Sequence, residues 1–195
     1  MLNALTVRKP AGFTIIELMI AVVIMAILMA LALPSFRTWM QNIQIRNAGG
    51  AITNGLQKAR AEAVARNTNV SFVLGTDSSW TVKIIVGTPD PVPPPNPNPD
   101  PDILIESRSS AENSQNVTVS ILPLGATTVT FDSFGKVRKD LITGLPANTD
   151  GSTPITLMDI SADGGTKNMR VTIGVGGNAK MCDPSLTTGS SPSAC

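Results

Sequence analysis

The chain has 195 residues, with 15 basic and 14 acidic side chains and a formal net charge of +1. This near-neutral balance argues against bulk electrostatic attraction to nucleic acid, and the lack of histidine removes the commonest proton shuttle and a common metal ligand. The length allows one small domain in addition to a membrane-spanning segment.

The N-terminal region contains a segment long and apolar enough to cross a membrane. Gly12 precedes Phe13-Thr14-Ile15-Ile16-Glu17, and an uncharged apolar run follows from Leu18 to Leu33. As a helix, these residues would span about 30 Å, the thickness of a bilayer core. Arg8 and Lys9 precede the segment, so we expect the N-terminus in the cytoplasm and the rest of the chain exported.

Glu17 is the one charged residue of this segment. A carboxylate costs roughly 3 kcal/mol or more at the centre of a bilayer, so a compensating interaction is expected. One interpretation is local: an acid in the first turn of a helix meets the positive end of the helix dipole, or offsets an amine of its own chain. The other is assembly, in which Glu17 pairs with a cationic group on a neighbouring copy.

Two other interpretations of the segment lead to different mature N-termini. Ala30-Leu31-Ala32 has the small residues of a secretory signal cleavage site, which would leave a soluble protein that begins at Leu33. An uncleaved single-span anchor would retain Met1. Cleavage after Gly12 would expose Phe13, so N-terminal sequencing separates the three.

Gly12 followed by Phe13-Thr14-Ile15-Ile16-Glu17-Leu18 resembles the class III signal of type IV prepilins and type II secretion pseudopilins. The resemblance implies that a prepilin peptidase cleaves after Gly12 and methylates Phe13. It also implies a leader over residues 1–12, a transmembrane and assembly helix over 13–34, and Glu17 as the assembly carboxylate.

Beyond Pro34, which should bend or loosen the helix, the apolar residues continue at helical spacing. We expect an amphipathic helix over residues 35–67 that lays one face on a globular domain, weakened at Gly49, Gly50 and Gly55. The predicted apolar stripe comprises Phe36, Trp39, Met40, Ile43, Ala48, Ile52, Leu56, Ala59 and Ala63.

From residue 68 to residue 195 the pattern predicts an antiparallel β domain, so the fold class is α+β. Short segments rich in Val, Ile and Thr alternate with Gly, Pro, Asn and Asp. A loop over 88–102 is rich in proline and should be extended and exposed. The predicted strands are 70–74, 80–86, 103–106, 117–122, 127–131, 155–160 and 169–175.

Two cysteines, Cys182 and Cys195, lie at the extreme C-terminus. A terminal pair in an exported chain predicts a disulfide, which requires an oxidising compartment such as the periplasm or the cell surface. The alternative is two unrelated free thiols.

Three downstream segments resemble the FimT and pseudopilin-H (GspH) group: Gln57 to Asn67, Phe131 to Val137, and Arg170 to Cys182. The resemblance implies a type IV pilin-like fold with a long N-terminal helix on an antiparallel sheet domain. It also implies a low-abundance subunit that primes or caps a pilus or pseudopilus.

Some FimT-like members bind DNA through a Gly-Arg-x-Arg segment near the C-terminus. Here the corresponding residues are Gly177-Asn178-Ala179-Lys180, and both arginines are missing. Other basic residues offer a phosphate-contacting patch or an ordinary charged surface. They are Lys136, Arg138, Lys139, Lys167, Arg170 and Lys180.

We find no Walker loop, no Gly-x-Ser-x-Gly elbow and no metal-spaced Cys/His set in the sequence, so we expect no enzyme, cofactor or metal site. The primary hypothesis is a minor pilin of a type IV pilus, anchored in the bacterial inner membrane with its domain in the periplasm, and later part of a pilus. Its partners would be major and minor pilins and the prepilin peptidase. The alternatives are a type II secretion pseudopilin and a DNA-binding minor pilin.

Overall fold

The computed structural model describes residues 12–85, 102–112, 114–140, 143–187, 189 and 191–195. The predicted leader and the predicted proline-rich loop lie outside these residues, except for Gly12 and Asp102. Two compact units make up the chain, residues 1–37 and residues 38–195.

A single helix, α1, runs from Ile15 to Arg66 and includes Pro34 in its interior. The helix ends in a C-terminal cap, in which the residue after the helix adopts the left-handed conformation. Asn67 has a φ of 51°, its N–H donates to the carbonyl of Val64, and the N–H of Thr68 donates to the carbonyl of Ala63. These two bonds satisfy carbonyls at the end of the helix that would otherwise lack a partner.

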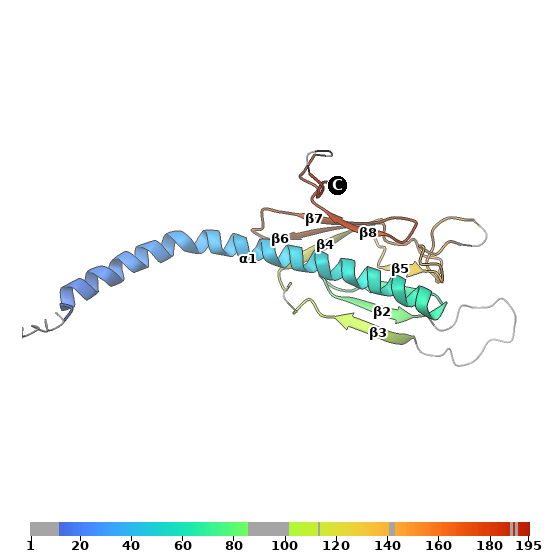
Figure 1. The fold of residues 1–195 in the computed structure, drawn as a ribbon, viewed down its shortest axis with the longest axis horizontal. Coiled ribbons are helices and arrows are strands. Elements are labelled where there is room, and N and C mark those ends of the chain that lie inside the picture. Colours follow the sequence, from blue (N-terminus) through green and yellow to red (C-terminus); the bar gives the residue numbers. More distant parts are fainter. Residues whose placement is uncertain (1–11, 86–101, 113, 141–142, 188, 190) are drawn as a thin grey trace, which may run out of the picture. The chain divides into compact units, whose positions relative to one another are not determined.

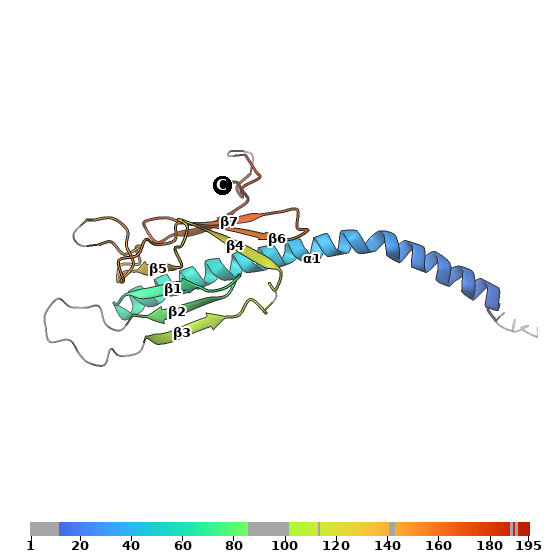
Figure 2. The ribbon, with the colours of Figure 1, turned by 180° about the vertical axis from the view of Figure 1, so that it is seen from behind.

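Two antiparallel four-stranded sheets make up the rest of the described chain. The first sheet has the order β3-β2-β1-β5 and the second the order β4-β6-β7-β8 (Figures 1 and 2). The strands of the first sheet are β1 (Val70–Leu74), β2 (Trp80–Ile84), β3 (Ile103–Arg108) and β5 (Thr128–Phe131). Those of the second are β4 (Val117–Leu122), β6 (Leu157–Ala162), β7 (Met169–Ile173) and β8 (Ala179–Cys182).

Backbone hydrogen bonds join the two sheets just before β6. The N–H of Ile155 donates to the carbonyl of Thr128 in the first sheet, at 3.0 Å, and the N–H of Thr156 donates to Leu122 in the second, at 2.9 Å. The sequence predicted that this strand begins at Ile155. It begins instead at Leu157, because residues 155 and 156 link one sheet to the other.

The part of α1 that belongs to the second unit lies along both sheets (Figures 1 and 2). Its buried residues follow the i, i+3, i+4, i+7 pattern of one helix face, as in Ile45, Ala48, Gly49 and Ile52. They pack into one core with side chains of both sheets, among them Phe72, Phe131, Met158 and Ile160. The buried helix residues are Ile45, Ala48, Gly49, Ala51, Ile52, Gly55, Leu56, Ala59 and Ala63.

Gly49 and Gly55 allow this close approach. A Cβ on Gly55 would lie 2.9 Å from the Phe72 ring and 3.0 Å from the Trp80 ring, and a Cβ on Gly49 would lie 2.8 Å from the Met181 sulfur. Gly50 has no such neighbour within 4 Å. The glycines that the sequence marked as weak points of the helix therefore include two that the packing requires.

The first part of the predicted apolar stripe is wrong. Phe36 and Trp39 are more than half exposed, and Met40 is exposed at 39%. Ile43, in the same part of the stripe, precedes Ile52 by nine residues, which is about 2.5 helical turns, so the two face opposite sides of α1. Ile45, absent from the prediction, occupies the buried face.

The α+β fold class is confirmed, with two sheets where the sequence predicted one β domain. Most predicted strands differ from the observed ones by one or two residues at an end. Strand β8 was not predicted from alternation, because only four residues separate Gly177-Asn178 from Asp183 and the resemblance alone indicated it. Val86, the predicted end of the second strand, lies outside the described residues.

Candidate assembly site

The predicted cleavage bond lies in an exposed segment before the helix. Gly12 and Phe13 precede α1, the side chain of Phe13 is 83% exposed, and nothing lies within 4 Å of the position that a Cβ on Gly12 would take. The predicted cleavage bond therefore lies outside regular secondary structure, with open space beside the glycine.

Thr14 caps the start of α1, which the sequence analysis did not identify. The hydroxyl oxygen of Thr14 accepts a hydrogen bond from the N–H of Glu17 at 3.3 Å, and the carbonyl of Thr14 accepts from the N–H of Leu18 at 3.1 Å. Thr14-Ile15-Ile16-Glu17 has the Thr-x-x-Glu spacing of a capping box, in which the acid stands three residues after the cap. That spacing was readable from the sequence.

Glu17 therefore stands in the first turn of α1, where a negative charge is favourable. Glu17 is exposed, and so are the apolar side chains around it, including Ile16 and Leu18. By length and composition, α1 is able to cross a membrane, and its most apolar window is wholly exposed in the monomer. This window therefore requires either lipid or other helices to cover it.

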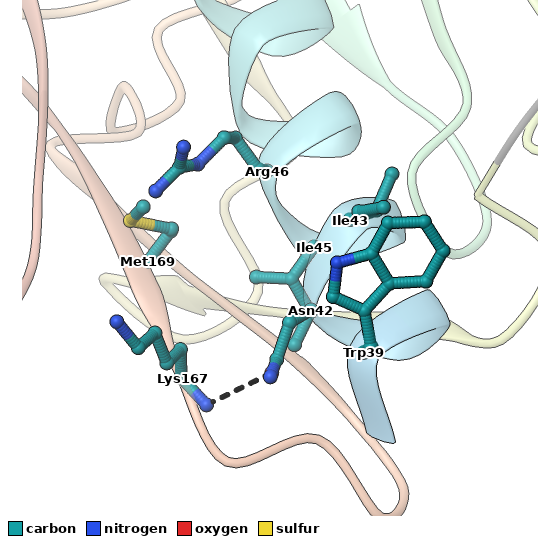
Figure 3. Close-up of a pocket in the computed structure, with 7 residues that line it drawn as sticks. All are labelled: Trp39, Asn42, Ile43, Ile45, Arg46, Lys167 and Met169. Atoms are coloured by element: carbon teal, nitrogen blue, oxygen red, sulfur yellow. Dashed lines mark hydrogen bonds between the residues drawn. The ribbon is translucent and has the colours of Figure 1, made fainter. Parts of the chain in front are cut away.

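A pocket lies against α1 near the start of the second unit (Figure 3). Asn42 connects the helix to the turn between β6 and β7, because its Oδ1 accepts from the N–H groups of Thr166 (3.1 Å) and Lys167 (3.2 Å). Its Nδ2 donates to the Thr166 hydroxyl at 3.1 Å. We call this feature the Trp39 pocket. Its lining residues are Trp39, Asn42, Ile43, Ile45, Arg46, Lys167 and Met169.

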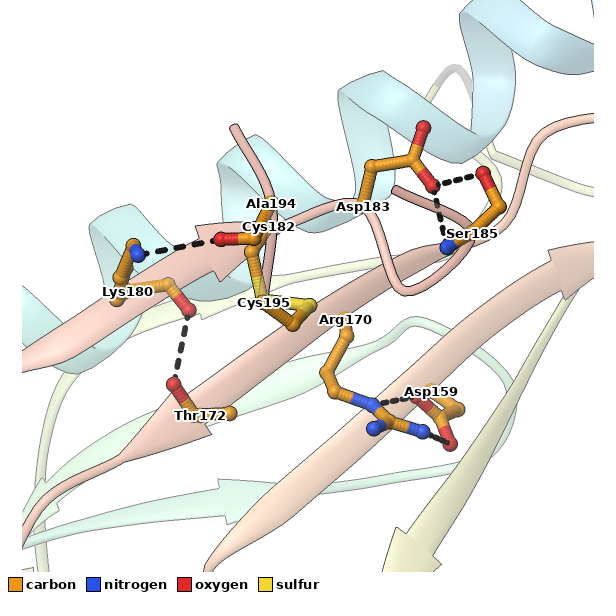
Figure 4. Close-up of a disulfide and its surroundings, with 9 residues drawn as sticks. All are labelled: Asp159, Arg170, Thr172, Lys180, Cys182, Asp183, Ser185, Ala194 and Cys195. Carbon is orange, nitrogen blue, oxygen red and sulfur yellow. Dashed lines mark hydrogen bonds and ion pairs between the residues drawn. A yellow bond between two sulfur atoms is a disulfide. The ribbon is translucent and has the colours of Figure 1, made fainter. Parts of the chain in front are cut away.

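Cys182 and Cys195 form a disulfide that closes the C-terminal segment (Figure 4). Around it, the Nζ of Lys180 donates to the carbonyl of Ala194 at 3.4 Å, and the N–H of Asp183 donates to the carbonyl of Ser193 at 2.7 Å. These contacts hold the end of the chain beside β8, one of the two edge strands of the second sheet.

The carboxylate of Asp183 orders the first turn of this C-terminal segment. It accepts hydrogen bonds from the hydroxyl of Ser185 at 2.6 Å and from the Ser185 N–H at 2.9 Å. Both bonds favour the ionised form, so they hold the pKa of Asp183 below its ordinary value of 3.8, with a smaller contribution from Lys167. Asp150 has the same arrangement with Ser152, and its pKa is lowered for the same reason.

Three of the six basic residues considered for DNA contact already have partners in the domain. Arg170 forms two hydrogen bonds with the carboxylate of Asp159, at 2.6 and 2.8 Å (Figure 4). The guanidinium of Arg138 donates to the carbonyl of Asn148 at 2.8 Å. Lys180 contacts Ala194, as described above.

The remaining three, Lys136, Lys139 and Lys167, are exposed but do not all lie together. Lys136 follows Gly135, whose carbonyl accepts from the Nε of Arg60 at 2.9 Å, whereas the backbone of Lys167 is bound to Asn42. Asn42 and Arg60 stand 18 residues apart in α1, about 27 Å along the axis. The domain therefore distributes these charges along its length.

Two family models match the chain. The model of type II transport protein GspH matches residues 48–177, and the model of the prokaryotic N-terminal methylation motif matches residues 7–33. The first match covers the buried half of α1 and both sheets up to the turn after β7. The second covers the predicted cleavage site and the apolar run. No curated protein matches the chain.

Solved structures that are similar to the chain include a minor pilin and a minor pseudopilin, both at low sequence identity. The type IV minor pilin FimU of Pseudomonas aeruginosa (strain PAO1) is 14% identical, with a TM-score of 0.42 over 77% of this chain and 98% of that one. The minor pseudopilin EpsH of the Vibrio cholerae type 2 secretion system is 12% identical, with a TM-score of 0.44 over 73% of this chain and 99% of that one.

Proposed function

The chain belongs to the GspH family of type II transport proteins, and from this membership we propose that it is a minor pilin that primes or caps the assembly of a type IV pilus. The family consists of structural pilin and pseudopilin subunits, not enzymes. The observation that carries the proposal is the occurrence of both family matches in one chain, the methylation motif at residues 7–33 and the GspH domain at 48–177.

Processing at the N-terminus creates the assembly site in this proposal. Prepilin peptidase cleaves between Gly12 and Phe13 and methylates the new amine, which places a positive charge at the start of α1. That charge is unfavourable beside the positive end of the helix dipole. A carboxylate offsets it, and Glu17 stands in the first helical turn.

The pairing of Glu17 with a neighbour explains the preference for other helices over lipid. In a filament, the Phe13 amine of one subunit and the Glu17 carboxylate of the next neutralise each other inside an apolar bundle, where an unpaired charge would be costly. The exposed apolar side chains between Ile15 and Leu33 supply the surface that packs against neighbouring helices. Inner-membrane anchoring, with the domain on the periplasmic side, precedes this step.

One alternative has a specific observation in its favour. The matching family model is that of a type II transport protein. The alternative function is therefore that of a pseudopilin in the export of folded proteins. The physical role of α1 and Glu17 is the same in both cases, because both filaments pack N-terminal helices. Only the machine and its cargo differ.

A deletion strain separates the two functions. A pilus subunit predicts loss of twitching motility and of surface pili with normal enzyme secretion, and a pseudopilin predicts the reverse. Complementation by the full chain must restore the lost function. If both activities remain normal in the deletion strain, neither role holds.

A further inference from the structure

The Trp39 pocket combines an apolar wall with two cations that lack a strong partner. Trp39 and Ile43 lie on one side of it, and Arg46, Met169 and Lys167 on the other (Figure 3). Arg46 and Lys167 are exposed. Across the part of the chain that the structure describes, neither side chain forms an ion pair or a side-chain hydrogen bond.

The fold fixes the backbone positions of these two residues. Arg46 projects from α1, one residue after the buried Ile45. The backbone of Lys167 is held by Asn42 from the same helix, although the two residues are 125 positions apart in the sequence. The pocket therefore brings two positive charges from different elements to one apolar cavity, and Met169 lies between them (Figure 3).

The acidic groups near Lys167 only partly offset this charge. The ammonium of Lys167 is a minor cause of the lowered pKa of Asp183, after the hydrogen bonds from Ser185, and Asp163 is exposed in the same turn. Asp183 is already committed to Ser185. Arg46 has no acidic partner in the described chain, so the site favours an anion at the Arg46 side.

The length of the chain also limits how far the pocket can lie from the end of the apolar run. Trp39 is only six positions after Leu33, the end of the apolar run. In helical form these six positions rise about 9 Å, and fully extended they reach about 20 Å at most. The headgroup layer on each side of the hydrocarbon core is about 5 to 8 Å deep. Tryptophan is enriched at this level because its ring is apolar and its N–H is polar.

We propose that the Trp39 pocket binds the phosphate of an anionic phospholipid in the leaflet next to the domain. The guanidinium of Arg46 and the ammonium of Lys167 contact the phosphate oxygens, and Arg is suited to this by its planar array of donors. Trp39 and Ile43 contact the glycerol and the upper acyl chain. The proposal requires only that the apolar segment lies in a bilayer, and it does not depend on the role in a filament.

The test uses the full chain in a neutral detergent. Dioleoyl phosphatidylglycerol or dioleoyl phosphatidylcholine is added at equal concentration, and native mass spectrometry measures the lipid that each protein retains. We expect about tenfold tighter retention of phosphatidylglycerol, because each cation near an anionic lipid contributes severalfold. The double variant Arg46→Gln/Lys167→Gln should bind both lipids equally.

A matched control removes two exposed lysines elsewhere in the domain. Lys136→Gln/Lys139→Gln makes the same change in net charge and should keep the tenfold preference. Thermal unfolding of both double variants must match the parent. Trp39→Ala should weaken the retention of both lipids and leave the preference for phosphatidylglycerol intact.

Four results would overturn the proposal. The first is equal retention of the two lipids by the parent. The second is a preference for phosphatidylglycerol that survives in Arg46→Gln/Lys167→Gln. The third is loss of this preference in the control variant to the same extent as in Arg46→Gln/Lys167→Gln, which would indicate an effect of bulk charge. The fourth is displacement of the lipid by millimolar inorganic phosphate, which would indicate a site for a soluble anion. Reduced filament incorporation of the double variant with an unchanged lipid preference would assign the two cations to a carboxylate of a partner subunit instead.

Discussion

At the scale of single residues, the contact between α1 and the sheets depends on two glycines that have no side chain at the points of closest approach. Gly55 lies against the rings of Phe72 and Trp80, whose centroids are 5.8 Å apart and whose planes are tilted by 31°. A methyl group has no room there unless an aromatic ring moves. Gly49 faces the end of a flexible methionine side chain, which moves more easily.

The three helix glycines should therefore respond differently to alanine. Gly55→Ala should lower the free energy of unfolding by about 1 to 3 kcal/mol, the usual cost of overpacking. Gly49→Ala should cost less, because Met181 can shift. Gly50→Ala, at an open helical position, should raise stability by about 0.5 to 1 kcal/mol. Urea unfolding of the second unit, followed by tryptophan fluorescence of the full chain in detergent, measures all three.

Gly50→Ala also serves as the control for the general effect of alanine on helix propensity. If Gly55→Ala proved as stabilising as Gly50→Ala, the close packing of α1 on the first sheet would be wrong.

The carboxylates of Asp150 and Asp183 should make the stability of the fold depend on pH. Hydrogen bonds from Ser152 and Ser185 lower the pKa values of Asp150 and Asp183 below the ordinary value of 3.8. A lowered folded-state pKa means that the unfolded chain takes up protons first, so this stabilisation is complete well above pH 3.8 and is lost as the pH falls below it. Asp150→Asn/Asp183→Asn should flatten the decline of the melting temperature between pH 5 and pH 3.

The comparison is made against the parent chain over the same pH range in the same detergent. Asparagine keeps an oxygen acceptor in each turn, so the fold is preserved. An unchanged slope in the double variant would show that neither carboxylate contributes to the acid sensitivity.

At the scale of elements, the helix shows how far sequence reasoning reaches. Its existence and its end near Asn67 follow from local patterns, and the methylation motif matched over residues 7–33 was indicated by the resemblance to prepilins. The orientation of its first exposed turns does not, because Phe36 and Trp39 are as apolar as Ile45 and only the tertiary contact decides which face is covered. The Trp39 pocket could not be predicted from the sequence either, because it forms where Asn42 binds the backbone of a turn 125 residues away.

Asn42 should control the stability of the turn between β6 and β7. Its side chain makes hydrogen bonds to Thr166 and Lys167 that no other group replaces in the described chain. These bonds are exposed, so water can partly replace them, and each contributes about 0.5 to 1.5 kcal/mol. Asn42→Ala should therefore accelerate hydrogen exchange at the amides of Thr166 and Lys167 by about tenfold or more.

Asn47→Ala provides the matched control, because Asn47 is an exposed asparagine on the same helix. It should leave the exchange of both amides unchanged. Equal acceleration in the two variants would mean that the effect comes from the helix and not from the side-chain bonds of Asn42.

At the scale of the whole molecule, the domain is secured by its core and by the C-terminal disulfide. The bridge closes a loop with a sequence separation of 13, and loops of this size contribute about 3 kcal/mol in the chain-entropy account. Cys182→Ser/Cys195→Ser should lower the free energy of unfolding by about that amount. Reduction of the parent chain with dithiothreitol should produce the same shift in the urea midpoint.

Serine substitution also changes packing at the buried Cys182. Only equal shifts after substitution and after reduction would therefore assign the lost stability to the crosslink. If reduction left the urea midpoint unchanged while the double variant shifted it, the loss would come from packing and not from the crosslink.

The filament role can be tested by separating the two properties of Glu17, its charge and its place three residues after Thr14. Glutamine retains the length and the polar group that suit this place in a capping box, but it removes the charge. Aspartate retains the charge on a shorter side chain. The measurement is the amount of this subunit, by immunoblot, in sheared filaments from cells that produce each variant, relative to its amount in membranes.

If the carboxylate pairs with the amine of a neighbouring subunit, Glu17→Gln and Glu17→Ala should both be absent from filaments, and Glu17→Asp should be partly incorporated. The membrane levels and the N-terminus at Phe13 should be the same in all of them. Incorporation of Glu17→Gln at the parent level would contradict the account, because it would show that the charge has no part in assembly.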